Sequence, residues 1–228
     1  MVSVPSIMCI STVFPLQQAM AQLSSSDLAP TPASPSTSPP PPPTSTSTSP
    51  FQGTSNLLTY TNSTYGISIQ YPSDWSLTPM SQPRGTNNTF FPIIEFVPPI
   101  SEDPNADTYS VVGIDNTTRS VTPTLDGYTI NEINGFRANA NVTDLKVVKA
   151  GTNVTIGGQP GFLLYMTYGL IEKPGSAPTP RNYLEAGTIS RGLIYYVSIN
   201  SAVSDREFTT VLLPQVLQMI KSFQLVQQ

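Results

Sequence analysis

The side chains of this sequence that could move protons or hold metal ions are few, and their types limit the chemistry. The chain has no His and one Cys, Cys9, which lies in an apolar stretch near the N-terminus. Histidine is the commonest proton shuttle and metal ligand near neutral pH, so its absence excludes His-based hydrolase triads and most zinc or copper sites. Serine is plentiful, but no Gly-x-Ser-x-Gly motif activates one as a nucleophile. We therefore expect no enzyme, and rank an unrecognised hydrolase last among the functions considered.

A short acidic segment has part of the pattern of a calcium-binding loop. Asp103, Asn105 and Asp107 in SEDPNAD stand at alternate positions, as oxygen ligands do in such loops. Thr108 stands where that loop requires Gly, and Ile114 where it requires a bidentate Glu. We expect an ordinary surface loop and no cofactor, and keep calcium binding at these three residues as the alternative.

The pair Asp74-Trp75 has the residue types of a general acid beside an aromatic platform. A general acid needs a second group at a suitable spacing, and no carboxylate near Asp74 in the sequence supplies it. Pro72-Ser73-Asp74 is typical of a turn, and a single Trp is most often buried. We predict a turn that leads into a core tryptophan. Residues 157–161 (GGQPG) indicate a hairpin turn and not a phosphate-binding loop, because neither Lys nor Ser/Thr follows them into a helix.

Two further sets of residues are candidates for modification and binding. Asn-x-Ser/Thr sequons are expected at turns or strand ends and become glycosylation sites if the protein is exported by a cell with N-glycosylation. They are Asn62, Asn87, Asn116, Asn141 and Asn153. Tyrosines on the last strands form a partner or ligand surface if one sheet face is exposed, and core if helices cover both faces, which we favour. They are Tyr165, Tyr168, Tyr183, Tyr195 and Tyr196.

Charge also restricts the choice of partner. The chain carries 14 acidic and 10 basic residues, and charged residues are only 11% of the total. Nucleic-acid binding requires clustered Lys and Arg, which are absent here, so we expect no nucleic-acid partner.

The N-terminal quarter of the chain differs from the rest. Residues 7–16 are apolar and Ala19-Met20-Ala21 has the small-x-small pattern of a signal-peptidase site, so residues 1–21 are predicted to be a signal peptide. Residues 22–56 are rich in Pro, Ser and Thr, a composition that favours an extended stalk because it buries no apolar surface. Residues 57–228 then form the predicted folded domain. We expect an extracellular or cell-surface protein, attached to a membrane only through a larger assembly or an uncleaved N-terminus.

Alternating apolar and polar residues predict several antiparallel strands in that domain. The predicted strands are 65–71, Phe90–Val97, 108–115, Leu145–Lys149, Val154–Ile156, Phe162–Leu170 and two runs joined by a hairpin at Arg191-Gly192. Residues 124–138 predict a short helix. Ser204 and Glu207 form a capping box before a C-terminal helix, which we expect to restart near Pro214 after a short first turn. The fold class is therefore α+β.

Three stretches, taken in order, resemble the PsbP-like domain family over residues 57–226. They are YGISIQYPSDW (65–75), TIGGQPGFLLYMTY (155–168) and the tail from Gly192 to Val226, which includes Ser222-Phe223. The resemblance implies an α/β/α sandwich around an antiparallel β-sheet, with a C-terminal helix and no catalytic activity. Known members are extrinsic subunits of photosystem II that help to retain calcium and chloride, and relatives in other microbes are secreted.

These observations define three functional expectations. The first is a secreted or cell-surface, non-enzymatic accessory or interaction module with a protein or glycan partner. The second is a module that binds calcium or another small ligand. The third, an extrinsic photosystem-type subunit, follows from the resemblance alone, and the stalk and simple export signal differ from a plastid transit peptide.

Overall fold

The computed structural model describes residues 56–80, 90–99, 107–116 and 123–226 of the chain. A seven-stranded antiparallel sheet has the order β3-β4-β5-β9-β8-β7-β6, and a small sheet has the order β1-β2-β10. The elements are β1 (Leu57–Asn62), β2 (Ile67–Pro72), β3 (Ser76–Pro79), β4 (Phe90–Val97), β5 (Thr108–Asp115), α2 (Leu125–Ala138), β6 (Val142–Ile156), β7 (Gln159–Leu170), β8 (Thr179–Ser190), β9 (Leu193–Ser201), α3 (Asp205–Glu207), η2 (Phe208–Leu212), α4 (Leu213–Ser222) and β10 (Gln224–Leu225).

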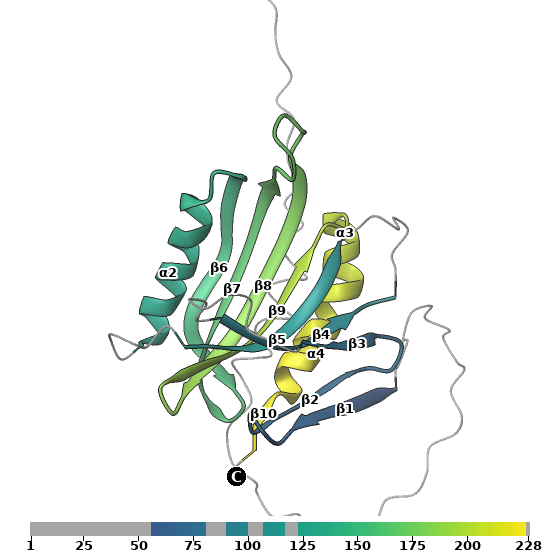
Figure 1. Cartoon of the computed structure of the whole chain (residues 1–228), viewed down its shortest axis with the longest axis vertical. Coiled ribbons are helices and arrows are strands. Elements are labelled where there is room, and N and C mark those ends of the chain that lie inside the picture. Colours follow the sequence, from purple (N-terminus) through teal and green to yellow (C-terminus); the bar gives the residue numbers. More distant parts are fainter. Residues whose placement is uncertain (1–55, 81–89, 100–106, 117–122, 227–228) are drawn as a thin grey trace, which may run out of the picture.

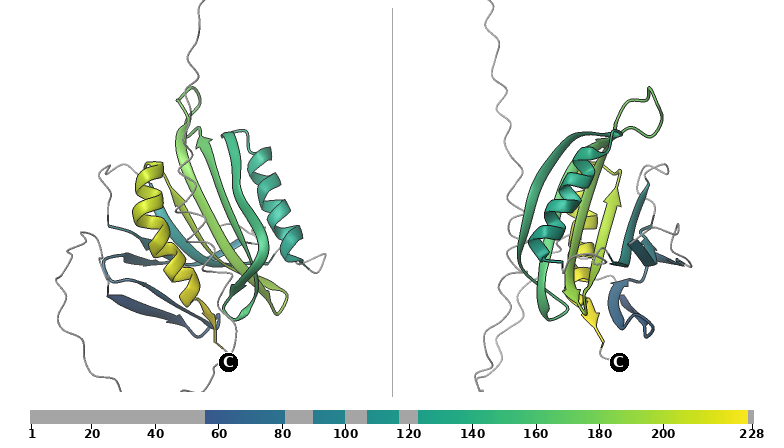
Figure 2. Two further views of the ribbon diagram at one scale, coloured as in Figure 1. Left: turned by 180° about the vertical axis from the view of Figure 1, so that it is seen from behind. Right: turned by 60° about the vertical axis from the view of Figure 1, so that its left-hand side comes forward.

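Two helices lie on opposite faces of the large sheet (Figures 1 and 2). Helix α2 packs on one face beside β6 and β7, and α4 crosses the other face together with the small sheet. The expected α/β/α sandwich around an antiparallel sheet, with a C-terminal helix, is confirmed. Among the described segments, no helix has the length and apolar character needed to cross a membrane.

The main core lies between the large sheet, α4 and the small sheet. Tyr165 of β7 stacks on Phe208 with ring centroids 5.7 Å apart, and Phe208 is fully buried. Trp75 is 3% exposed and its ring nitrogen donates a hydrogen bond to Gln215 of α4. The backbone N–H of Trp75 donates to the Pro72 carbonyl at 3.1 Å, which closes the turn. The predicted turn and core tryptophan are both confirmed.

Helix α2 begins and ends close to the predicted limits. The Thr124 hydroxyl accepts a hydrogen bond from the backbone N–H of Gly127, which satisfies a free donor of the first turn. Tyr128 is buried and packs on Phe162 of β7, with ring centroids 5.0 Å apart. This contact, more than intrinsic propensity, fixes α2 on the sheet, since Gly127 and Gly135 both weaken a helix.

Two predicted elements differ from the structure. The two short strands expected between Leu145 and Ile156 are one strand, β6, because its pairing with β7 continues through three register shifts. The expected short first turn (α3) and the restart of the α-helix near Pro214 (α4) are confirmed, but the helix is continuous between them. It widens into a π-helical turn over η2, in which the Leu213 N–H donates to the Phe208 carbonyl. That wider turn accommodates proline, which has no N–H and would collide with the carbonyl four residues before it.

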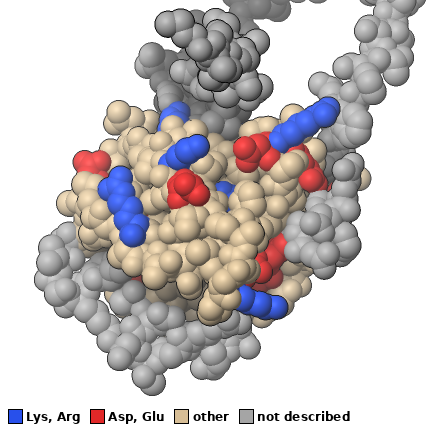
Figure 3. All heavy atoms as spheres, turned by 90° about the horizontal axis from the view of Figure 1, so that it is seen from above, with Lys and Arg blue, Asp and Glu red and all other residues tan. Residues whose placement is uncertain are grey.

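The surface carries few charges. Seen from above, small groups of acidic and basic side chains lie on a largely uncharged surface (Figure 3). This agrees with the low proportion of charged residues in the sequence.

Candidate functional site: a groove on the sheet and an adjoining carboxylate cluster

The predicted calcium-loop residues lie only partly within the described chain. Asp103 and Asn105 are outside the described residues. Asp107 is described, and its carboxylate forms an ion pair with Arg181, whose NH1 nitrogen lies 3.4 Å from Oδ2. The same nitrogen donates to the Asp107 backbone carbonyl at 2.9 Å. The Arg181 guanidinium is buried and is shared, because its NH2 nitrogen also lies 2.7 Å from Glu172 Oε1, so two carboxylates face one cation.

Four of the five sequons fall in described segments; Asn87 does not. Asn62 ends β1, is half-buried, and donates a hydrogen bond from its side-chain nitrogen to the Tyr60 hydroxyl. Asn116 follows β5, and Asn141 is exposed just before β6. Asn153 lies inside β6 next to a register shift, so the expectation that every sequon falls at a turn or strand end is wrong for this residue.

The tyrosines of the last strands do not form one exposed surface. Tyr165 and Tyr195 belong to the core under α4, whereas Tyr196 packs on the opposite face near α2. Tyr168 is also buried and receives a hydrogen bond from Asn200. Only Tyr183 is half-buried. Side chains alternate between faces along a strand, so neighbouring tyrosines in the sequence end on different sides of the sheet.

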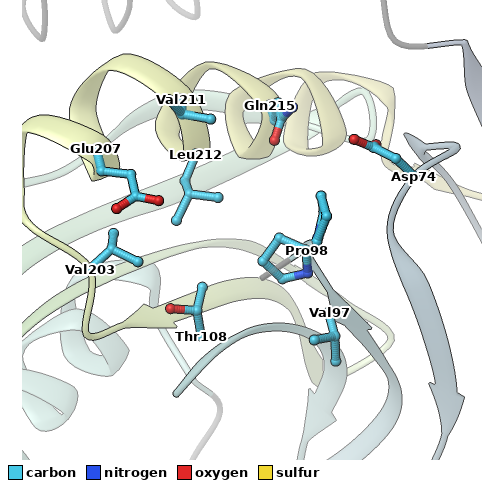
Figure 4. Close-up of a pocket in the computed structure, with 10 residues that line it drawn as sticks. Asp74, Val97, Pro98, Thr108, Val203, Glu207, Val211, Leu212 and Gln215 are labelled. Atoms are coloured by element: carbon cyan, nitrogen blue, oxygen red, sulfur yellow. The ribbon is translucent and has the colours of Figure 1, made fainter. Parts of the chain in front are cut away.

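Asp74 is exposed and borders a small pocket of about 140 Å³ near α3 and α4 (Figure 4). Glu207 lines the same pocket, so the fold brings to Asp74 a carboxylate that is distant in the sequence. The remaining lining is mainly apolar, with Val211 and Leu212 among its members. In Figure 4 the Glu207 carboxylate lies at the opposite end of the pocket from Asp74, so the two do not form a pair.

A larger hollow lies on the α2 face of the large sheet, over the strands that α2 leaves uncovered. We call it the sheet groove; its volume is about 440 Å³, within the range of about 300–1,000 Å³ typical of ligand pockets. It is lined by Met80, Phe90, Pro92, Glu95, Asp107, Tyr109, Val111, Tyr183, Ser198 and Asn200.

The strand register explains the floor of the sheet groove. Tyr183 of β8, Asn200 of β9 and Tyr109 of β5 are direct neighbours across three strands. The next row in the same direction is Glu185, Ser198, Val111 and Glu95. The floor therefore combines two half-buried aromatic rings, an amide and a hydroxyl, with a carboxylate at its β4 side. Of the described lining residues, none is Lys or Arg.

A buried carboxylate cluster adjoins this floor beneath α2. We use that name for Glu185, Glu132 and Asp115 with their tyrosine neighbours. Glu185 is 2% exposed and accepts hydrogen bonds from the hydroxyls of Tyr128, at 2.8 Å, and of Tyr183. Tyr183 belongs to both the sheet groove and the buried carboxylate cluster, since its side chain lines the groove and its hydroxyl contacts Glu185.

Burial and like charge raise the proton affinity of this cluster. Burial, and next the Glu132 carboxylate, raise the pKa of Glu185 to about 8, although the hydrogen bonds from Tyr183 and Tyr128 lower it. Burial and then Asp115 raise the pKa of Glu132 to about 7. Burial, followed by the charge of Glu185, also raises the pKa of Tyr128 far above its ordinary value. Near neutral pH the cluster therefore holds protons that isolated carboxyls would lose.

The chemistry available at this site is hydrogen bonding, charge recognition and proton exchange near neutral pH. An ionised Glu185 accepts from both tyrosines, and a protonated Glu185 donates to one of them. Within the described chain, no group of three or more His, Cys, Asp or Glu side chains is arranged to hold a metal ion. Clefts with strongly shifted carboxyl groups are candidate functional sites on physical grounds.

Sequence patterns indicated these residues only weakly. Glu132 follows Asn131 in a predicted helix and resembles an ordinary surface acid. One indication was available: Glu185 lies within a strand of otherwise apolar character, at a position that alternates with buried residues.

A scan against protein-family models found no match to the chain, and a search of curated proteins found none either. Solved structures do match. Cyanobacterial PsbP from Synechocystis sp. PCC 6803 is similar with a TM-score of 0.52 and 17% identity, covering 76% of this chain and 95% of that one. The chain therefore has the PsbP-like fold.

Two other structures align with lower scores. LpqN of Mycobacterium tuberculosis, described as involved in cell envelope biogenesis, matches with a TM-score of 0.47 and 17% identity over 71% of this chain and 83% of its own. The Saccharomyces cerevisiae Ran-binding protein Mog1p matches with a TM-score of 0.47 and 14% identity over 76% of this chain and 97% of its own.

Proposed function

We propose that this protein is an exported, non-enzymatic interaction module that binds a segment of a partner protein in the sheet groove. The observation that carries the proposal is the groove floor, where Tyr183, Asn200 and Tyr109 lie side by side next to Ser198 and Glu95. Aromatic rings that carry a hydroxyl, placed among hydrogen-bonding groups, are the usual anchors of protein interfaces.

The charge of the sheet groove supports a partner segment with a basic side chain. Glu95 and Asp107 line the groove, and the described lining contains no cation. Asp107 shares Arg181 with Glu172, whereas no ion pair among the described residues involves Glu95, so Glu95 is the carboxylate that receives a Lys or Arg of the partner. The known roles of PsbP are not transferred, because a fold shared at this identity does not define function.

Export rests on the apolar stretch at residues 7–16 and the Ala-Met-Ala motif that follows. Cell fractionation tests this part: the protein should be recovered outside the cytoplasm and should start after Ala21. Recovery only from the cytoplasm would contradict it.

Binding in the groove is tested by capturing partners from the envelope fraction of the source organism with the full chain. The variants Tyr109→Ala and Glu95→Gln should each lose the captured partner, because they remove a ring and a charge from the floor. Ile130→Ala serves as the control, since Ile130 is 57% exposed on α2 outside the groove.

Two results would count against this function. One is equal recovery of every captured protein by wild type, both groove variants and the control. The other is turnover in a broad hydrolase screen that is lost when Glu95 or Glu185 is changed.

A further inference from the structure

A second hollow lies at the end of the molecule where three hairpin turns meet. The turns are those between β1 and β2, between β6 and β7, and between β8 and β9, near β10 in Figure 1. Tyr65, Arg191 and Tyr195 are shared by two adjoining pockets of about 310 and 180 Å³. We call this pair the hairpin-end pocket; it shares no lining residue with the sheet groove.

The hairpin-end pocket is held in shape by β10. The Val226 N–H donates to the Gly66 carbonyl at 2.8 Å, and Gly157 bridges to Gln224. Gly66 has a φ of +63°, and a side chain there would approach the Val226 carbonyl oxygen to 2.8 Å. The β1–β2 and β6–β7 turns are thus tied to one another through β10 before any ligand arrives, which lowers the entropy cost of binding.

The lining has one cation, and it contains no carboxylate. Besides Arg191 it is aromatic, apolar or uncharged, and no described lining residue is Asp or Glu. Tyr65 is 42% exposed and Val226 is 44% exposed, so apolar surface beside the guanidinium is open to a partner. No ion pair in the described chain involves Arg191.

Arg191 also has a left-handed backbone conformation, which residues other than glycine rarely adopt. Its φ is +52°, followed by +75° at Gly192, the pair of left-handed residues of a tight hairpin. Asn, Asp or Gly suit the first of these positions better than Arg. A strained residue that carries a functional group is a reasonable sign of selection for that group.

We propose that the hairpin-end pocket binds an acidic segment of a partner protein, in which a Glu or Asp side chain pairs with Arg191 and a neighbouring apolar side chain packs on Tyr65. The planar guanidinium matches one carboxylate through two parallel hydrogen bonds. Anionic membrane binding requires clusters of about four to eight Lys or Arg, and the described lining offers one.

The test uses the full chain and two peptides, acetyl-Leu-Glu-Phe-amide and acetyl-Leu-Gln-Phe-amide, followed by NMR. The Glu peptide should shift the amide signals of Gly66 and Gly192 saturably, and the Gln peptide should bind at least about tenfold more weakly, since it lacks the charged acceptor.

Substitutions then locate the binding. Arg191→Asn should weaken binding of the Glu peptide by at least about tenfold while Tm stays the same or rises, because Asn tolerates the left-handed conformation. Arg191→Lys should retain part of the affinity. Arg137→Asn is the matched control, an exposed arginine in the last turn of α2, and should bind like wild type.

Several outcomes would overturn the proposal. They are equal affinity for the two peptides, no binding of either, or an unchanged affinity in Arg191→Asn. Arg191-dependent binding to phosphatidylglycerol vesicles without peptide binding would assign the pocket to a lipid instead. Because the sheet groove lies elsewhere, a negative result for peptide binding in the hairpin-end pocket leaves the envelope capture assay unaffected.

Discussion

Replacing Glu185 by Gln tests the buried carboxylate cluster, because it removes the titrating proton and keeps the shape of the side chain. The amide oxygen can accept from one tyrosine and the amide nitrogen can donate to the other. A difference in the free energy of unfolding between wild type and Glu185→Gln should therefore report mainly on ionisation of the Glu185 carboxyl.

The magnitude follows from the linkage between protonation and folding. The pKa of Glu185 is raised from 4.5 to about 8 in the folded protein, so between these values the folded state binds more protons than the unfolded state. The contribution of Glu185 to wild-type stability is then fully present below pH 4.5 and is lost as pH rises to about 8. A shift of this size corresponds to about 5 kcal/mol of the free energy of unfolding.

The assay is urea unfolding of both proteins at intervals from pH 5 to 9. Trp75 is the only tryptophan and is 3% exposed, so its fluorescence reports unfolding, and far-UV circular dichroism checks that the transition is two-state. The stability of Glu185→Gln relative to wild type should rise by a few kcal/mol over this range. Asp144→Asn, which removes an exposed carboxylate, should keep the wild-type slope. Equal pH slopes for wild type and Glu185→Gln would refute the raised pKa.

Three other predictions concern different parts of the molecule. Millimolar calcium should leave Tm unchanged, because Arg181 already pairs with Asp107; a clear rise measured by calorimetry would support the calcium-loop alternative. Phe208→Ala should lower the free energy of unfolding by about 3–5 kcal/mol in urea titrations, since it empties a fully buried site under Tyr165. In a host that glycosylates proteins, Asn141→Gln should reduce the mass measured by mass spectrometry, because Asn141 is exposed. Asn62→Gln should not reduce it, because the Asn62 side chain already donates a hydrogen bond to Tyr60; the opposite result would contradict this prediction.

Local patterns were sufficient for most of the secondary structure. Alternation placed β4 and β5 at the residues where the structure has them, and Arg191-Gly192 marked a hairpin because few residue pairs accept two left-handed conformations. Ser204 caps the C-terminal helix through the Glu207 N–H, as its spacing predicted. These features depend on neighbours within a few residues, so the sequence alone contained the information.

The candidate sites depended on contacts that the sequence does not show. Glu185 meets Tyr128 across a separation of 57 residues, and burial, followed by the charge of Glu132, raises the pKa of the Glu185 carboxyl. Asp107 had the spacing of a calcium ligand, but the fold places Arg181 beside it. The sequence by itself thus determined β4, β5, the hairpin at Arg191-Gly192, the Ser204 cap and the absence of His chemistry. Tertiary structure alone decided which polar groups are buried together, because the energy of a charge depends on its surroundings in space.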